Sequence, residues 1–77
     1  MTDNEGQNVE RDFFEDGIRE LDSGNIARAI ESFLLAIALT PDDYRIYSNL
    51  GIAYELAMNF EKAREAYEKA IALNPDS

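Results

Sequence analysis

The sequence predicts an all-α protein built from two helix-turn-helix units that follow one another along the chain. Two observations carry this prediction. Aligning residues 10–43 with residues 44–77 pairs identical residues at 12 of 34 positions without a gap. Within each unit, hydrophobic residues recur at the three- and four-residue spacing of an α-helix. We therefore expect four antiparallel helices in one domain, two in each repeat.

The first repeat is expected to span residues 10–43, after a polar N-terminal tail of residues 1–9 that we expect to be disordered. Its first helix carries an apolar stripe from Phe13 to Leu21. Ser23 and Gly24 end this helix, because glycine readily adopts the left-handed conformation of a helix C-cap.

The second helix of this repeat carries an apolar stripe from Ile26 to Leu39. Asn25 is expected to cap its N-terminus, since a side-chain oxygen there can accept a hydrogen bond from a free backbone N–H group. Pro41 ends the helix because proline has no N–H group to continue it.

The second repeat is expected to span residues 44–77, with helices from about Tyr44 to Ala57 and from Phe60 to Leu73. Asp42 or Asp43 can cap the first of these, and Pro75 ends the second. Met58 occupies the position of Gly24. A left-handed backbone there would cost a residue with a side chain about 1–2 kcal/mol, so the substitution Met58→Gly is expected to stabilise the protein.

Small and aromatic residues recur at matching positions of the two repeats. The small ones sit where two antiparallel helices could approach closely, and the aromatic ones would fill the space beside them. The small residues are Gly17, Ala29 and Ala36 in the first repeat and Gly51, Ala63 and Ala70 in the second, and the aromatic ones are Phe13, Phe33, Tyr47 and Tyr67.

These positions carry a resemblance to a known family. The second repeat reads Tyr47-x2-Leu50-Gly51-x2-Tyr54, then Ala63-x3-Tyr67, Ala70 and Pro75, and it resembles a tetratricopeptide repeat in which tyrosine replaces tryptophan. The first repeat matches at Phe13, Gly17, Gly24, Ala29, Phe33, Ala36 and Pro41, and it departs at Asp16 and Glu20. The resemblance covers residues 10–77. It implies the start of a right-handed α-solenoid that binds proteins and catalyses no reaction.

The departures indicate which helix begins the stack. One face of the first helix is polar, at Asp12, Asp16, Glu20 and Ser23, where the third helix has Ile46, Leu50, Tyr54 and Ala57. Burying unpaired carboxylates is strongly unfavourable. We therefore expect the third helix to pack this face on the first repeat, and the first helix to leave it in solvent. A calcium site in the acidic stripe is not expected, because regular helix supplies neither backbone carbonyls nor a tight turn.

The outer face of the fourth helix is polar only in part, unlike the polar face of the first helix. It has Arg64, Glu68 and Lys69 where the second helix has Ile30, Leu34 and Leu35, but Ile71 remains apolar. Two alternatives follow: the natural chain continues as a larger repeat protein, or the chain self-associates through a face that contains Arg64, Tyr67 and Ile71. On the second helix, we expect Leu34 to pack under the third helix. The sequence does not decide whether Leu35 is packed or exposed.

The resemblance also implies a ligand groove lined by the first helix of each repeat. Such a surface could hold an amphipathic helix or an extended peptide of a partner protein. The alternative is that Phe14 and Ile18 complete the thin core. A clamp for acidic peptide tails is not expected, since Phe14 and Ile18 replace the polar residues that it needs. The groove residues, carried over by helical face, would be Arg11, Phe14, Glu15, Ile18, Asp22, Arg45, Ser48, Asn49, Ile52 and Leu56.

Composition narrows the classes of function. The chain has a net charge of −9, no cysteine and no histidine. We therefore expect no catalytic site, no metal, no cofactor and no nucleic-acid partner, and a protein or peptide partner of basic character. The longest apolar run, residues 33–39, is too short to span a bilayer, and the N-terminus does not resemble a signal peptide. The cytoplasm is the expected location.

Overall fold

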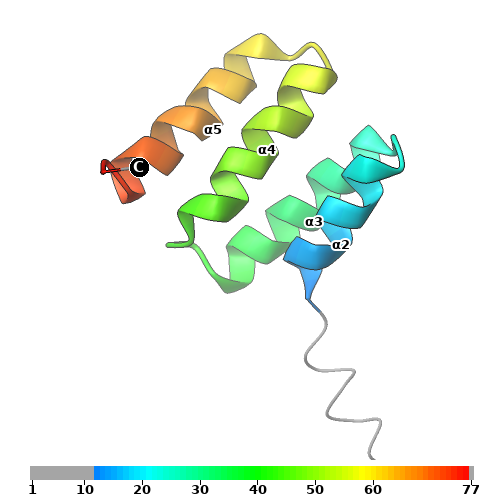
Figure 1. Ribbon diagram of the computed structural model, residues 1–77, viewed down its shortest axis with the longest axis horizontal. Coiled ribbons are helices and arrows are strands. Elements are labelled where there is room, and N and C mark those ends of the chain that lie inside the picture. The colour runs from blue at the N-terminus through cyan, green and yellow to red at the C-terminus, as the bar shows by residue number, and fades with distance from the viewer. Residues whose placement is uncertain (1–11, 77) are drawn as a thin grey trace, which may run out of the picture.

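The computed structural model describes residues 12–76. Within this range it contains four helices and no strand, and the helices form two antiparallel hairpins that lie side by side (Figure 1). The predicted all-α architecture is confirmed, with helix bounds within a residue of those expected. The expected disordered tail of residues 1–9 lies outside the described residues. The helices are α2 (Phe13–Asp22), α3 (Ile26–Leu39), α4 (Tyr44–Leu56) and α5 (Phe60–Leu73).

Aspartate or asparagine side chains cap the N-termini of three of the described helices. The carboxylate of Asp12 accepts a hydrogen bond from the backbone N–H of Glu15 at the start of α2. Asp43, rather than Asp42, caps α4 by accepting from the backbone N–H of Arg45. At the start of α5, the side-chain oxygen of Asn59 accepts from the backbone N–H of Lys62. These bonds satisfy donors that have no partner inside the helix.

The prediction that the side chain of Asn25 caps α3 is wrong. Asn25 occupies the N-cap position but makes no capping bond there. Its amide instead donates to the carboxylate of Glu20, 2.8 Å away on α2. A charged acceptor makes a stronger hydrogen bond than a neutral one, and the short turn brings Glu20 within reach.

The turns inside the two hairpins share one backbone geometry. Gly24 has φ 84° and Met58 has φ 64°, both in the left-handed region. The backbone N–H of the next residue donates to the carbonyl five positions earlier, from Asn25 to Glu20 and from Asn59 to Tyr54. Met58 therefore adopts the conformation that the sequence comparison with Gly24 predicts.

Each hairpin closes tightly around a glycine. A Cβ atom added to Gly17 would lie 2.4 Å from the ring of Phe33, and one added to Gly51 would lie 2.5 Å from the ring of Tyr67. No real side chain fits at such distances. The predicted pairing of small residues with aromatic rings is confirmed for Gly17 with Phe33 and for Gly51 with Tyr67.

The core lies where α4 packs on α3. Among the described residues, helices in contact follow chain order: α2 with α3, α3 with α4 and α4 with α5, with a smaller contact between α2 and α4. Ile46 and Leu50 of α4 are buried in one cluster with Phe33 of α3, which confirms that the third helix packs on the first repeat. Asp12 is exposed, and Asp16 and Glu20 are partly exposed. Asp16 pairs with Arg19 at 3.2 Å.

The expectation that Leu34 packs under α4 is wrong. Leu34 is 46% exposed and Leu35 is 49% exposed. Successive residues of an α-helix are about 100° apart around its axis, so Leu34 lies well away from the buried Phe33. Ile30 and Ile37, which flank Phe33, are partly buried and pack against the core instead.

Candidate functional site

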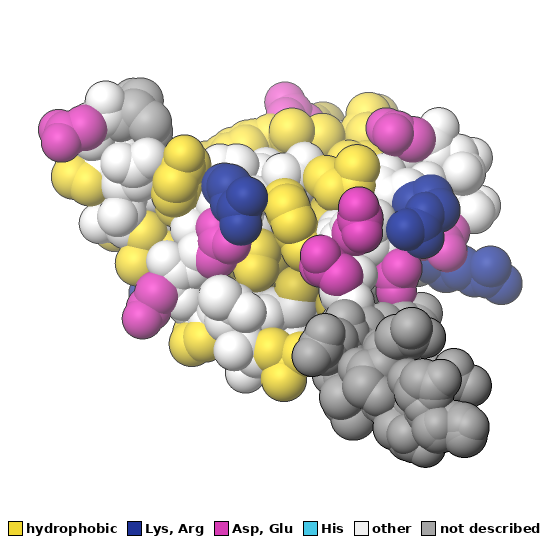
Figure 2. Space-filling model, turned by 60° about the horizontal axis from the view of Figure 1, so that its bottom comes forward, with side chains coloured by type: hydrophobic (Ala, Val, Ile, Leu, Met, Phe, Trp, Pro, Cys, Tyr) yellow, Lys and Arg dark blue, Asp and Glu magenta, His cyan; other side chains and the backbone are white. Residues whose placement is uncertain are grey.

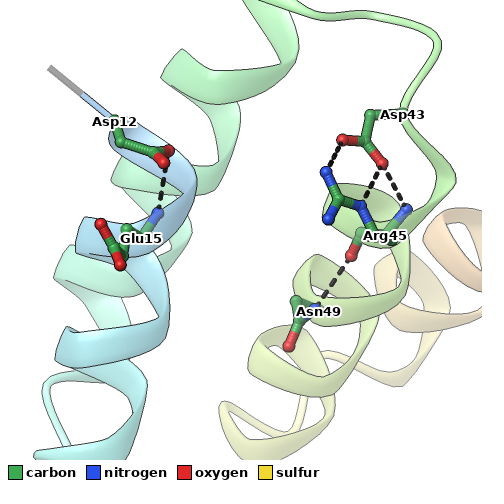
Figure 3. A network of polar contacts seen from close by, with 5 residues as sticks. All are labelled: Asp12, Glu15, Asp43, Arg45 and Asn49. Atoms are coloured by element: carbon green, nitrogen blue, oxygen red, sulfur yellow. Dashed lines mark hydrogen bonds and ion pairs between the residues drawn. The ribbon is translucent and has the colours of Figure 1, made fainter. Parts of the chain in front are cut away.

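The candidate site lies where the N-terminal halves of α2 and α4 run beside each other. The guanidinium of Arg45 on α4 lies 5.2 Å from the ring centroid of Phe14 on α2, so a cation–π contact joins the two helices. Figure 3 shows these ends of the two helices with their capping aspartates. The predicted groove residue Arg11 lies outside the described residues. The other groove residues lie on α2 (Phe14, Glu15, Ile18 and Asp22) and on α4 (Arg45, Ser48, Asn49, Ile52 and Leu56).

A hollow of about 360 Å³ opens at this place. Three segments meet around it: the start of α2, the end of α3 and the start of α4. Phe14 and Arg45 are the two predicted groove residues that line it. The other lining residues are Asp12, Phe13, Ala36, Leu39, Thr40, Asp43 and Ile46.

Charge at the hollow is organised around Arg45. Its Nε and backbone N–H both lie 3.0 Å from Oδ1 of Asp43, and its Nη2 lies 2.6 Å from Oδ2 (Figure 3). Hydrogen bonding to Arg45 lowers the pKa of Asp43, with the positive charge of Arg45 acting in the same direction. The same bond raises the pKa of Arg45, and Asp12 across the hollow contributes to this rise. Arg45 is thus a cation bound by Asp43, with Asp12 acting on it only through its charge.

The predicted apolar residues of the groove differ between the two helices. Phe14 and Ile18 are partly buried and pack against the core, and the ring of Phe14 lies 6.1 Å from that of Phe33. Ile52 and Leu56 on α4 are exposed. The amide of Asn49 donates to the backbone carbonyl of Arg45, 2.9 Å away. The hydrophobic surface that a ligand could reach therefore lies mainly on α4.

A second hollow of about 330 Å³ lies on α5 and is lined by residues of the predicted self-association face. The hydroxyl of Tyr67 donates to the carboxylate of Glu55, 2.7 Å away. Burial, together with this bond to an anion, raises the pKa of Tyr67 to about 12, so the phenol stays protonated near neutral pH. The hollow is lined by Glu55, Phe60, Ala63, Arg64, Tyr67, Glu68 and Ile71.

Sequence reasoning missed several residues of the first hollow as members of a site. Leu39 and Thr40 come from the end of α3 and were not expected at any site. Asp12 was expected only on the solvent-exposed polar face of the first helix, and Asp43 only as a helix cap. Their common signal is position, because each lies at or next to a helix end. Only the packing of the hairpins shows that these ends meet.

Comparison with known proteins identifies the repeats. A tetratricopeptide repeat profile matches residues 44–77, and a second profile, described as TPR repeat, matches residues 17–56. The chain belongs to the tetratricopeptide repeat family. Repeats of this family mediate protein–protein interactions and are typically non-catalytic.

The similar proteins are much longer than this chain. Superkiller protein 3 of Schizosaccharomyces pombe is 35% identical over 60 residues, which are 78% of this chain and 4% of that protein. Protein O-mannosyl-transferase TMTC1 of Homo sapiens is 32% identical over 65 residues, or 84% of this chain and 7% of that protein. The Mus musculus protein of the same name matches to the same extent. The likeness thus concerns the tetratricopeptide repeats.

Two further observations apply to residues 12–76. No helix in this range is long and apolar enough to cross a membrane. The same part of the chain holds no group of three or more aspartates or glutamates placed to bind a metal ion.

Proposed function

We propose that this chain is a non-catalytic adaptor that binds a peptide segment of a partner protein along α2 and α4. The observation that carries the proposal is the exposure of Ile52 and Leu56 on α4, the helix whose N-terminal end lines a hollow together with Phe14 of α2. Exposed apolar side chains along one helix are typical of surfaces that accept hydrophobic anchors of a peptide. The cytoplasm is the proposed location.

The chemistry of the partner follows from charge. The chain carries a net charge of −9, and hydrophobic and acidic side chains intermingle on the face shown in Figure 2. Glu15 and Asp22 on α2 are exposed, and Asp12 lies at the edge of the hollow. A peptide that combines leucine-like anchors with lysine or arginine would match this surface. Nucleic acid would be repelled.

Peptide binding can test this proposal. The probe is a fluorescein-labelled 14-residue helical peptide of leucine and lysine, and its matched control has glutamate at every lysine position. Fluorescence anisotropy should show binding of the lysine peptide only, and the affinity should fall as salt is raised. Ile52→Ser should weaken binding about tenfold, because it removes a central apolar anchor without changing charge.

Ile71→Ser supplies the matched control variant, since it makes the same change at an exposed isoleucine of α5. It should leave peptide binding unchanged. Equal weakening by both substitutions, or equal binding of both peptides, would contradict a specific site along α2 and α4.

Self-association is the second candidate function, through the face that contains Arg64, Tyr67 and Ile71. Ile71 is 63% exposed and lines the second hollow together with Phe60, which is 59% exposed, and neighbouring exposed apolar side chains favour a protein contact there. This candidate does not require the peptide site, and the two can coexist in one molecule.

A further inference from the structure

One surface of α5 repeats a surface that is covered elsewhere in the molecule. We call Phe60, Arg64, Tyr67 and Ile71 the α5 face. At the 34-residue offset they correspond to residues of α3, which packs against α4 with Phe33 fully buried. The α5 face is open: Phe60 is 59% exposed and Ile71 is 63% exposed, and among the described residues α5 packs on α4 alone. The α3 counterparts are Ile26, Ile30, Phe33 and Ile37.

A second copy cannot cover the α5 face by simply continuing the stack. Continuation would lay α2 of the second copy on the α5 face, as α4 lies on α3. The side of α4 that faces α3 carries Ile46, Leu50 and Tyr54. At the equivalent positions α2 carries Asp12, Asp16 and Glu20. Moving carboxylates from water onto an apolar surface is costly even when some are paired. Head-to-tail growth is therefore disfavoured.

The α5 face is complementary to itself when two copies of the helix run antiparallel. Its residues are spaced four, three and four apart, and this spacing reads the same in both directions. It is also the spacing of the apolar seam in paired helices. In an antiparallel pair centred between residues 65 and 66, Phe60 would lie opposite Ile71 of the second copy.

Charge fits the same arrangement. Arg64 would lie opposite Tyr67 of the second copy. The next residue of that second helix is Glu68, which would therefore lie beside Arg64. Glu68 is exposed and lines the same hollow as Arg64. A two-fold axis makes each such contact twice, so two opposite-charge pairs would flank the apolar contacts.

We propose that a second copy of this chain binds the α5 face with its own α5, antiparallel, to form a closed dimer with two-fold symmetry. The inference rests on the self-association candidate and gives it a geometry and a stoichiometry. A helix of 14 residues is about 21 Å long, so the contact buries less than the roughly 800 Å² per partner of a stable complex. The dimer is therefore weak and reversible.

Reciprocal charge variants test this geometry in the full chain. Analytical ultracentrifugation from about 10 µM to about 1 mM covers the range in which so small an interface associates. Arg64→Glu alone places like charges together, and so does Glu68→Arg alone. Each should weaken dimerisation at least about tenfold, whereas an equimolar mixture of the two variants should form a dimer, because the mixed pair restores both opposite-charge contacts.

The matched controls are Arg28→Glu and Glu31→Arg, which make the same charge changes at exposed positions of α3 outside the α5 face. They should leave dimerisation unchanged. Circular dichroism should report the same helicity for all variants, and the restored dimer in the mixture itself shows that both variants fold.

Three outcomes would overturn the inference. A chain that stays monomeric throughout the range has no self-association. A dimer that ignores the charge changes, or a mixture no more associated than its components, uses another surface. Growth beyond the dimer indicates open stacking. Binding of the leucine–lysine peptide, measured on the same variants, reports separately on α2 and α4, so a failure of either proposal is distinguishable from a failure of the other.

Discussion

At the turn after α4, Met58 adopts the left-handed backbone conformation that Gly24 adopts after α2. A side chain in this conformation is strained, because its Cβ crowds the neighbouring carbonyl oxygen. The side chain of Met58 is 74% exposed, so little packing compensates for the strain. The repeat thus tolerates a residue with a side chain at a position that favours glycine.

Replacing this residue should stabilise the protein. Met58→Gly relieves about 1–2 kcal/mol of strain. It also gives back part of this gain, because glycine has more freedom in the unfolded chain. We expect the free energy of unfolding to rise by about 0.5–1 kcal/mol, measured by urea denaturation followed by circular dichroism.

Gly24→Ala provides the reverse test at the equivalent turn. A Cβ there would meet no atom within 4 Å, so its effect should come from the backbone alone. The free energy of unfolding is expected to fall by about 1 kcal/mol.

A lower unfolding midpoint for Met58→Gly would contradict the strain account. It would show instead that the methionine side chain makes a stabilising contact.

Among the elements, α4 begins with the most closely bonded cap in the described part of the chain. Asp43 accepts the backbone N–H of Arg45 and two bonds from its guanidinium. These interactions lower the pKa of Asp43 below its ordinary value of 3.8. Because the folded pKa is the lower one, the ionised carboxylate stabilises the fold at pH values above about 4, and this stabilisation is lost as the pH falls through the lowered pKa.

The Asp43→Asn variant should reveal this contribution. At pH 6 it should unfold at a lower urea concentration than the parent chain, and the difference should shrink as the pH falls towards about 2.5. Asparagine can still cap a helix, so the comparison keeps the cap and removes the charge together with a hydrogen bond to the guanidinium. Asp42→Asn, at the neighbouring exposed aspartate, should change stability little at either pH. A difference for Asp43→Asn that is independent of pH would contradict this account.

The elements themselves were predictable from sequence, whereas their mutual placement was predictable only in part. Periodicity and the turn residues located all four helices of the described residues, and the 34-residue offset identified the left-handed turn at Met58. Local pattern could not show that Asn25 bonds Glu20, because the choice of acceptor depends on the geometry of the turn. Nor could it place Leu34, since periodicity identifies an apolar stripe but not where the next helix crosses it.

The candidate site shows the same division. The groove residues came from a resemblance, and the structure places those within its range on α2 and α4, where their role as a peptide site stays a prediction. The hollow beside Phe14 was not predictable, because Leu39 and Thr40 reach it only through the packing of one hairpin on the other.

At the scale of the whole molecule, we expect the difference between α2 and α5 to control assembly. The triple variant Asp12→Ile, Asp16→Leu, Glu20→Tyr gives α2 the residues that α4 uses to cover α3. We expect this variant to stack head to tail, because its α2 can then bury against α5 of another copy. Light scattering should show a particle mass that rises with concentration beyond a dimer.

Adding Ile71→Glu to the triple variant should prevent this growth by placing a charge on the surface that receives α2. If the triple variant keeps the mass of the parent chain at every concentration, the carboxylates of α2 are not what prevents stacking.

The order of contacts among the helices also determines how the molecule opens. Among the described helices α5 packs on α4 alone, so its release breaks one packing interface and leaves the contact between α3 and α4 in place. Release of α4 would break the contact with α3 as well. The molecule is therefore expected to fluctuate from its ends inward, with the last helix detaching more often than the centre. A partner that binds α5 would therefore damp the motion of a helix that packs on a single neighbour.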